Sequence, residues 1–377
     1  MSTSFGFLSS FPPTQCGLAT FTAALEAEIA AAGHGTGVVR VLERPAAFTG
    51  STIVQHMVHG QPDALERAVA VLNTFDVVVV QHEYGIYDGA DGDSIVEVLD
   101  LLRVPSIVVL HTVLVEPTRH QREVLDAIGR RASALVTMTA TAYQRLIDHY
   151  DVDEAKVAVI PHGAAGGCHG RPHRPAGRGP LMLTWGLLGP GKGIERVIEA
   201  LPSLRDLVPR PHYLVEGETH PKVLERDGEA YRDGLVARAR ALGVADMVTF
   251  RSRYLDVHSL SSLAASADVV ILPYDSREQV TSGVLIEAVA AHRPVIATAF
   301  AHAVELLASG AGIVVDHDDP SAMGAAIRLV LSEPAQSASM VTRAAELAPD
   351  LLWSAVAARY CVLADDLVTA DAAAALR

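Results

Sequence analysis

Aromatic residues, cysteines, positive charges and long apolar runs are all scarce in this sequence of 377 residues. Only 5% of the residues are aromatic although 50% are hydrophobic, so a folded core must be largely aliphatic. The three cysteines, Cys16, Cys168 and Cys361, are too few and too scattered for a disulfide framework, which is typical of a reducing compartment.

The apolar runs are too short for a membrane helix. Val77–Val80 and Val104–Leu110 have the length of strands, whereas a helix that crosses a bilayer needs about 20 apolar residues. The first residues also lack the basic region and long apolar stretch of a signal peptide. We therefore expect a cytoplasmic protein with no membrane span.

The shortage of positive charge disfavours nucleic acid and anionic lipid as partners. The net charge of −14 disfavours nucleic acid, because binding phosphate backbones takes clustered Lys and Arg. Residues 1–163 carry about nine more carboxylates than basic residues, so anionic lipid would repel this half of the chain.

The order of apolar and amphipathic segments predicts two domains, which fits the length of the chain. Continuous β-branched runs separated by helical patterns imply parallel sheets covered on both faces. Expected strands are Phe5–Ser9, Val38–Val41, Val77–Val80, Ile107–Leu110, Ala134–Met138 and Val157–Ile160, then Leu181–Trp185, His212–Glu216, Met247–Phe250, Val269–Leu272, Val295–Ala297 and Gly312–Val315.

The alternation stops in a segment dense in Gly, Pro and His. We therefore predict an N-terminal domain at 1–163, a linker at 164–180 and a C-terminal domain at 181–352. A last helix within 353–377 is expected to pack back on the first domain. The class is α/β, with two doubly wound Rossmann-like domains that face each other across a cleft, and ligands are expected at the carboxyl ends of the strands.

Two segments of the second domain suit a phosphate group. Thr281, Ser282 and Gly283 precede an apolar helix, whose free N–H groups and dipole favour an anion, and Glu287 lies one turn further on. The alternative is an ordinary helix cap with a solvated Glu.

The second segment runs from Gly186 to Gly193 and holds Lys192 before a helix. Its glycines permit close approach of the backbone to an anion, and no Ser or Thr follows Lys192-Gly193 as a magnesium ligand would in a Walker loop. The alternative is a tight turn with a solvated lysine.

Residues after three strands of the first domain are candidates as well. Gly17 lies in the turn after the first strand, and His111 ends the strand Ile107–Leu110. His82-Glu83-Tyr84 follows Val77–Val80 and fails the His-Glu-x-x-His pattern of zinc proteases, because position 86 is Ile. A lone histidine is more often structural than functional.

Taken in order, these segments resemble the successive signatures of family 4 glycosyltransferases, from about residue 5 to residue 365. The motifs that carry the resemblance are FPPTQCGLATFT at 11–22, VLHT at 109–112, IPHG at 160–163, GLLGPGKGIE at 186–195 and TSGVLIEAVA at 281–290. QHEYG at 81–85, a Gly-x-Thr-His-Pro run at 217–221 and QVTSG at 279–283 are typical of a bacterial subgroup.

The resemblance implies a GT-B fold, a retaining mechanism and a nucleotide-sugar donor. It places the donor's diphosphate between Lys192 and the helix start at Ser282–Val284, with Gly17 facing it from the other domain. Glu287 corresponds to the carboxylate that holds the ribose, and His111 to the histidine near the transferred sugar. Gly186, Thr281 and Gly283 belong to the same donor site, and His82, Glu83 and Tyr84 are assigned to the acceptor.

The match departs from the family at two positions. An Arg usually follows the glycine that opens the loop, and here it is Leu187. The family also has two carboxylates separated by seven residues, and here the first is Gln279, with Glu278 beside it. We count Glu278 and Gln279 among the catalytic candidates, and Arg253 or Arg277 as possible replacements for the missing arginine.

No metal or other cofactor is expected. Asp91-Gly92-Asp93 resembles the metal-binding Asp-x-Asp of a different glycosyltransferase fold but lies in a polar loop. His162, Cys168, His169 and His173 lack the repeated spacing of a zinc site.

The expected function is the transfer of a hexose from GDP-mannose, UDP-glucose or a similar donor to a hydroxyl of a soluble small-molecule or saccharide acceptor. Rival interpretations are an epimerase or phosphorylase on the same scaffold, and a protein that binds nucleotide sugars without catalysis. The sequence does not indicate the oligomeric state.

Overall fold

The computed structural model describes residues 2–48, 50–166 and 179–375. The chain divides into two compact units, one formed by residues 1–163 together with 353–377 and the other by residues 164–352. Most of the expected linker, residues 167–178 with Cys168, His169 and His173, lies outside the described residues.

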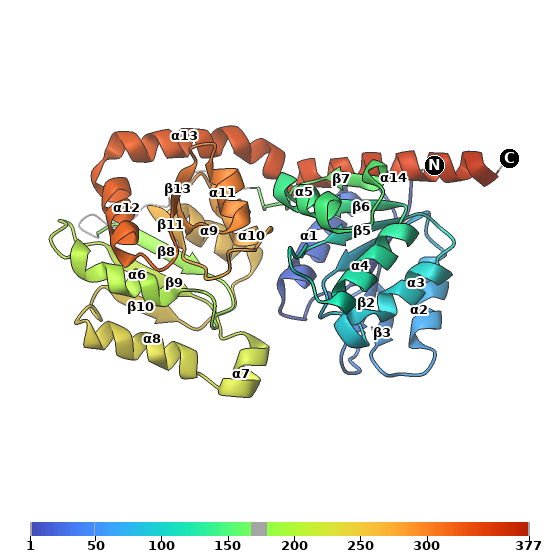
Figure 1. Ribbon diagram of the computed structural model, residues 1–377, viewed down its shortest axis with the longest axis horizontal. Helices are drawn as coiled ribbons and strands as arrows, with labels where there is room; N and C mark the ends of the chain where they lie inside the picture. Colours follow the sequence, from blue (N-terminus) through green and yellow to red (C-terminus); the bar gives the residue numbers. More distant parts are fainter. Residues whose placement is uncertain (1, 49, 167–178, 376–377) are drawn as a thin grey trace. The chain divides into compact units, whose positions relative to one another are not determined.

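Unit 1 is a parallel sheet of seven strands in the order β3-β2-β1-β4-β5-β6-β7, with helices on both faces (Figure 1). Its elements are β1 (Phe5–Ser9), α1 (Gly17–Ala31), β2 (Thr36–Leu42), β3 (Ile53–Val58), α2 (Ala64–Leu72), β4 (Val77–His82), η1 (Ala90–Gly92), α3 (Ser94–Leu101), β5 (Ser106–Leu110), α4 (Arg119–Arg131), β6 (Ala134–Thr137), α5 (Ala140–His149), η2 (Glu154–Lys156), β7 (Val157–Val159) and α14 (Trp353–Ala375).

The continuous apolar strands of unit 1 are buried on both faces. Successive side chains of a strand point to opposite sides of the sheet. Thus Phe5 and Phe7 contribute to a core with α1 and α14, while Leu8 is buried on the other face. This arrangement explains why these strands show no alternation of apolar and polar residues.

The last helix, α14, belongs to unit 1 although the whole of unit 2 precedes it in the chain. It packs against α1 and places Trp353, Val356 and Tyr360 in the same core. The ring of Trp353 lies against Phe21 of α1, with 4.9 Å between the ring centroids. It also fills the space beside Gly163, where a Cβ atom would lie 2.2 Å from the indole.

Unit 2 repeats the design with six parallel strands in the order β10-β9-β8-β11-β12-β13. Its elements are β8 (Leu181–Trp185), α6 (Ile194–Ala200), η3 (Leu201–Leu204), β9 (His212–Glu216), α7 (Pro221–Asp227), α8 (Ala230–Ala241), β10 (Val248–Arg251), α9 (Val257–Ser266), β11 (Val269–Leu272), α10 (Gly283–Ala290), β12 (Val295–Thr298), α11 (Ala301–Leu307), β13 (Gly312–Val315), α12 (Pro320–Ser332) and α13 (Pro334–Leu351).

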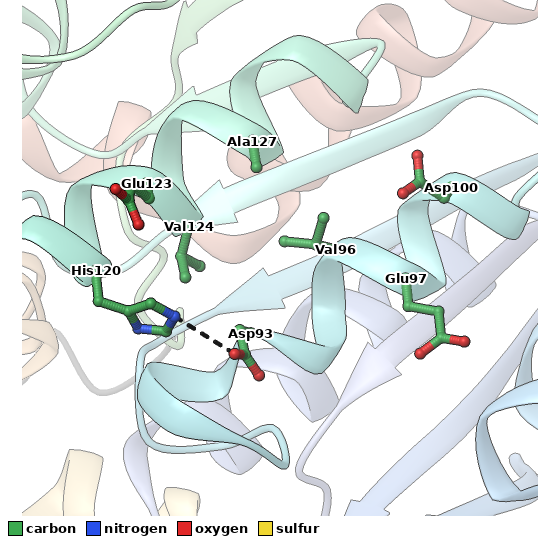
Figure 2. Close-up of a pocket in the computed structure, with 8 residues that line it drawn as sticks. All are labelled: Asp93, Val96, Glu97, Asp100, His120, Glu123, Val124 and Ala127. Atoms are coloured by element: carbon green, nitrogen blue, oxygen red, sulfur yellow. Dashed lines mark ion pairs between the residues drawn. The ribbon is translucent and has the colours of Figure 1, made fainter.

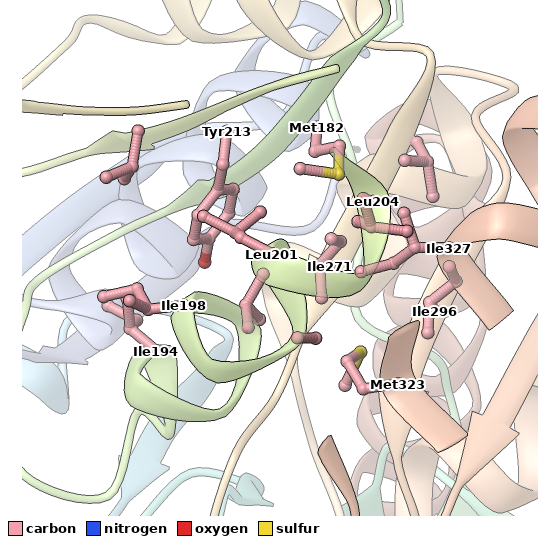
Figure 3. Packing of buried hydrophobic residues seen from close by; sticks show 14 of the residues in the cluster. Met182, Ile194, Ile198, Leu201, Leu204, Tyr213, Ile271, Ile296, Met323 and Ile327 are labelled. Carbon is pink, nitrogen blue, oxygen red and sulfur yellow. The ribbon is translucent and has the colours of Figure 1, made fainter. Parts of the chain in front are cut away.

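Two apolar clusters hold the helices of unit 2 to its sheet. Figure 3 shows the one in which Tyr213 and Ile271 of the sheet meet Ile198 of α6 and Ile327 of α12. The cluster on the other face packs α9, α10, α11 and α13 against Leu183, Leu272 and other strand residues. Because helices cover both faces, a polar ligand can reach this sheet at the ends of its strands.

The expected α/β class with two parallel sheets is confirmed. All the expected strands are present, most of them within a residue or two of their predicted bounds, and the sequence analysis missed only β3 among the strands of the described residues. β3 reads IVQHMV, which is interrupted by polar residues because it is the edge strand of its sheet. Among the described helices, none is both long and apolar enough to cross a bilayer.

The packing of α14 gives a testable pair of substitutions on one helix. Val356 is fully buried, whereas Val362 is 63% exposed. We expect Val356→Ala to destabilise the protein by about 1–3 kcal/mol, since it removes two methyl groups and leaves a cavity. Val362→Ala is the control and should change stability by less than about 0.5 kcal/mol. Urea unfolding of the full chain measures both, and equal effects would contradict the docking of α14 on α1.

Candidate functional site

The loop from Gly186 to Gly193, which follows β8, is held by the neighbouring segments of unit 2. Leu188 N donates to Glu218 O at 2.8 Å and His220 N donates to Leu188 O at 2.8 Å, so the run 217–221 braces one side of it. On the other side, Asp275 N donates to Gly191 O at 2.9 Å.

Glycine is required at one end of this loop. Gly193 has a φ of +61°, and a Cβ atom there would lie 1.8 Å from the carbonyl oxygen of Pro273. The loop therefore packs directly on the backbone that follows β11. This close approach brings Lys192 next to the segment that leads to α10.

Lys192 is a partly buried cation without a counter-charge. Its Nζ lies 4.7 Å from the centroid of the Tyr274 ring, and burial lowers its pKa. In the parts of the chain that the structure describes, no carboxylate forms an ion pair with it. A cation stacked on an aromatic face and left unpaired suits a phosphate ligand.

The start of α10 presents backbone donors at the same edge of the sheet. The Ser282 hydroxyl caps the helix by accepting from Leu285 N at 3.3 Å, and Ser282 N donates to His302 Nδ1 at 2.9 Å. The N–H groups of Gly283 and Val284 make no hydrogen bond within the described residues. They are the donors that a helix N-terminus offers to an anion.

Glu287 lies one turn into α10. Its Oε2 accepts from Trp185 Nε1 at 3.1 Å, at the end of β8. Burial raises the pKa of Glu287 to about 7, and the indole hydrogen bond offsets only part of that effect. Tyr274 lies beside Glu287 and Ser282 as well as under Lys192, and burial also raises its pKa. The structure thus brings Lys192, Ser282 and Glu287 together around one tyrosine.

Three of the four residues before Ser282, namely Glu278, Gln279 and Thr281, differ in their surroundings. Glu278 is exposed, whereas Gln279 is half-buried and its Nε2 donates to Thr281 O at 2.9 Å. Thr281 Oγ1 is buried and has no hydrogen-bond partner within the described residues. Gln279 therefore stabilises the segment before α10, while Thr281 keeps an unused hydroxyl there.

Arg253 is already engaged. Its Nε and Nη2 donate to the two oxygens of Glu216, at 2.9 and 3.2 Å, and Glu216 is 1% exposed at the end of β9. A bidentate pair of this kind is strong and geometrically specific. The guanidinium lies at the carboxyl edge of the sheet, but it is held by Glu216. Leu187 is half-buried and Arg277 is exposed.

In unit 1, Gly17 is the first residue of α1 and is exposed. Cys16 caps the helix, with Sγ accepting from Ala19 N at 3.4 Å. Gly17 follows β1 and His82 ends β4, and these two strands are neighbours in the sheet. The chain leaves these two strands toward opposite ends of the sheet, and the point between two such strands is where parallel sheets of this kind bind their ligands.

His111, at the end of β5, is fixed by two contacts. Its Nε2 is 2.7 Å from Gln81 Oε1, and its ring meets Phe21 edge to face with 4.9 Å between centroids. Burial, followed by the neighbouring His162 and His82, lowers the pKa of His111 to about 3. The ring is therefore neutral at pH 7, with Nε2 donating to Gln81 and Nδ1 carrying the lone pair.

The three acceptor candidates are His82, which is buried, and its neighbours Glu83 and Tyr84. β4 extends to His82, two residues beyond the predicted strand, and His82 is 1% exposed. Neither of its ring nitrogens has a hydrogen-bond partner within the described residues, and burial lowers its pKa to about 4. Glu83 accepts from Thr112 Oγ1 at 2.6 Å, and burial raises its pKa. The ring of Tyr84 lies 5.1 Å from that of His82.

A shallow hollow of about 400 Å³ lies between α3 and α4 (Figure 2). Its rim holds Asp93, Glu97, Asp100 and Glu123, which disfavour an anionic ligand there. His120 pairs with Asp91 at 2.9 Å and with Asp93 at 3.4 Å. Across the described residues, no group of three or more His, Cys, Asp or Glu side chains is placed to hold a metal ion.

Sequence reasoning missed three members of the unit 2 site. These are Trp185, Tyr274 and His302. Trp185 and Tyr274 are buried, and His302 accepts a hydrogen bond from Ser282 N. Trp185 and Tyr274 end or follow strands, which is the one signal that points to them. His302 has no signal in the sequence, because its contact depends on how α11 packs.

This chain is similar to one protein-family model and to curated bacterial glycosyltransferases. Residues 171–347 match the family model described as Glycosyl transferases group 1. A D-inositol 3-phosphate glycosyltransferase of Streptomyces avermitilis is 30% identical over 60% of this chain and 50% of its own length. A GDP-mannose-dependent phosphatidylinositol monomannoside mannosyltransferase of Mycolicibacterium smegmatis is 32% identical over 43% and 41%. The chain spans about half the length of these curated relatives.

Solved structures agree on the fold. The Anabaena protein HepE, solved with UDP, superposes with a TM-score of 0.77 over 97% of this chain and 100% of its own, at 15% identity. A sucrose-phosphate synthase of Thermosynechococcus elongatus gives 0.77 over 97% of this chain at 18% identity. The resemblance read from the motifs is confirmed: the chain has the GT-B fold, and its second unit carries the domain of the group 1 glycosyltransferases.

Proposed function

We propose that this protein is a retaining glycosyltransferase that moves a hexose from a nucleotide-diphosphate sugar to a hydroxyl group of an acceptor. The observation that carries the proposal is the arrangement at the switch point of unit 2. There an unpaired Lys192, the free N–H groups at the start of α10 and the carboxylate of Glu287 lie around Tyr274.

This arrangement suits the two halves of a nucleoside diphosphate. Lys192 and the N–H groups of Gly283 and Val284 supply positive potential for the diphosphate. Glu287 accepts hydrogen bonds, which suits the two hydroxyls of a ribose. The similarity to a GDP-mannose-dependent relative and to a fold solved with UDP supports a donor of this class.

The chemistry follows from where charge develops. As the glycosidic bond to the donor phosphate breaks, the leaving diphosphate gains negative charge, so Lys192 and the α10 dipole stabilise the transition state more than the ground state. The sugar's new bond forms on the same face that the diphosphate leaves. The acceptor hydroxyl then passes its proton to a phosphate oxygen, and no metal is needed in this scheme.

Unit 1 is assigned to the acceptor. His82 ends β4, Glu83 and Tyr84 follow it, and His111 follows β5. His111 is neutral with a pKa of about 3, so it is a weak base, but its Nδ1 can accept a hydrogen bond from a sugar hydroxyl. Its role is therefore to orient the sugar and not to remove a proton.

Two substitutions relative to the family favour a second candidate, a protein that binds nucleotide sugars without transferring them. Leu187 replaces an arginine of the family, and Gln279, whose amide is tied to Thr281 O, replaces a carboxylate. Both changes leave binding by Lys192 and Glu287 in place. Donor binding without release of free sugar or of a glycosylated product would favour this candidate.

The first experiment screens UDP, GDP, ADP and their sugars by thermal shift, with and without EDTA. A ligand that binds only the native state raises the melting temperature by mass action. We expect one nucleotide class to stabilise the protein, unaffected by EDTA. Lys192→Ala should lower the affinity for that nucleotide about 10- to 100-fold, as expected for loss of one charge-assisted contact.

Lys222→Ala is the matched control, because Lys222 is an exposed lysine of α7 in the same unit. It should keep the affinity of the wild-type protein within a factor of about three. Equal affinity of wild type and Lys192→Ala would overturn the assignment of the diphosphate site.

Glu287 makes donor affinity depend on pH. Its pKa of about 7 means that the carboxylate is mostly ionised at pH 8 and mostly protonated at pH 6. If the ribose binds the ionised form, binding lowers this pKa, and affinity falls up to about tenfold as the pH drops from 8 to 6. Glu287→Gln should remove that dependence.

Calorimetry with an intact nucleotide sugar measures the profile, because its diphosphate diester does not titrate in this range. A profile that stays the same in Glu287→Gln would show that another group is responsible.

A further inference from the structure

A second unpaired cation lies in unit 1, away from the residues discussed so far. Arg40 of β2 and His56 of β3 are neighbours in the register of the two strands. Both side chains are buried, with 4% and 8% of their surface exposed. They lie near the carboxyl ends of their strands, on the edge of the sheet where ligands of parallel sheets bind.

The guanidinium of Arg40 has few hydrogen-bond acceptors around it. Its Nη2 donates to Thr14 Oγ1 at 2.8 Å, and its Nε has no hydrogen-bond partner. Within the described ranges of the chain, no carboxylate forms an ion pair with it. Burial lowers its pKa, yet a guanidinium keeps its proton at neutral pH.

His56 adds a second polar atom without a partner, Nε2. Its ring stacks on Phe48 at 4.0 Å between centroids and 4° between planes. Burial first, and then the charge of Arg40, lowers its pKa. An anion beside Arg40 would remove that repulsion, so that the ring could be protonated and donate as well.

Arg196 and Arg293 show how buried or half-buried arginines with a structural role are satisfied in this chain, and Arg40 differs from both. Arg196 pairs with Asp275 and Asp318. The buried Arg293 donates to the carbonyl oxygens of Ala291 and Ala267. A buried charge with no such partners opposes folding, and an apolar side chain of similar size would pack there without that penalty.

The surroundings leave a route for a ligand. Thr14 belongs to the loop that follows β1, in which Pro12, Pro13 and Gln15 are exposed. Phe48 belongs to residues 43–48, which are exposed as well. The guanidinium therefore lies under two surface loops and not under a helix.

We propose that Arg40, Thr14 and His56 bind an anionic group, a phosphate or carboxylate, carried by the acceptor. The assignment to the acceptor rests on the proposed function. β2 and β4 flank β1, and neighbouring strands lie about 4.8 Å apart, so this subsite is about 10 Å from the end of β4 at His82–Tyr84. An acceptor about two sugar rings long, or one ring that carries the anionic group on a short arm, would reach from one to the other.

Unit 1 can bind a small anion at Arg40 despite its negative net charge. The excess of carboxylates in residues 1–163 disfavours anionic partners at long range. A buried guanidinium acts at contact distance in a site of low dielectric, where its effect exceeds that of exposed charges screened by salt. Unit 1 therefore selects a compact anion that fits between the two loops, and not an anionic surface.

The test titrates inorganic phosphate into the full-length protein, with and without a saturating nucleotide that fills the donor site. We expect phosphate to raise the melting temperature of the wild type in both conditions. With the donor site filled by nucleotide, Arg40→Met should need at least tenfold more phosphate than the wild type for the same rise in melting temperature. In buffer free of phosphate, its melting temperature should equal or exceed that of the wild type, because a buried unpaired charge is gone.

Arg67→Met is the matched control, since Arg67 is an exposed arginine of α2 in the same unit, and it should respond to phosphate as the wild type does. Arg40→Lys keeps the charge without the planar fork, and it should respond to phosphate more weakly than the wild type. A wild-type response in Arg40→Lys or Arg40→Met would overturn the proposal, as would a phosphate-free Arg40→Met that melts well below the wild type.

Nucleotide affinity separates the two sources of an anion. Under the proposal, Arg40→Met binds UDP or GDP as the wild type does. If it loses nucleotide affinity instead, the guanidinium serves the donor and the acceptor assignment is wrong. If the wild type binds phosphate through Arg40 but binds no nucleotide, the anion site stands while the proposed glycosyltransferase function fails.

Discussion

The parallel pairing of β8 with β11, and of β1 with β4, determines where chemistry can occur in this protein. In each unit the chain leaves these two adjacent strands in opposite directions, and the loops that follow them separate at the edge of the sheet. Gly186–Gly193 and the start of α10 are therefore neighbours in unit 2 although about 90 residues separate them. Gly17 and His82 are placed by the same rule in unit 1.

Charges without partners distinguish the candidate sites from the rest of the structure. Arg196 and Arg253 hold loops in place and are matched by carboxylates. Lys192 and Arg40 are at least partly buried and have no such match within the described residues. A protein pays in stability for each of these, so the positions where local rules are broken are the positions where a ligand is expected.

The sequence predicted the strands and their order well, because a buried parallel sheet requires continuous apolar runs and short turns between them. It also located Lys192, Ser282 and Glu287, which follow strands or begin a helix. It missed β3, whose polar residues reflect its place at the edge, and Tyr274, His302 and Arg40. The importance of these three comes from burial and missing partners, which depend on side-chain packing between elements far apart in the chain.

The two departures from the family change the electrostatic potential at the same place, the diphosphate site. Gln279 lies just before α10, and its amide ties the carbonyl of Thr281 in place. A carboxylate at that position would lie near the positive end of the helix and offset the potential that attracts a diphosphate. With Leu187 contributing no charge, an amide at 279 leaves the field of Lys192 and α10 undiminished. The loss of one arginine and the loss of one carboxylate thus act in opposite directions on the potential at the diphosphate site.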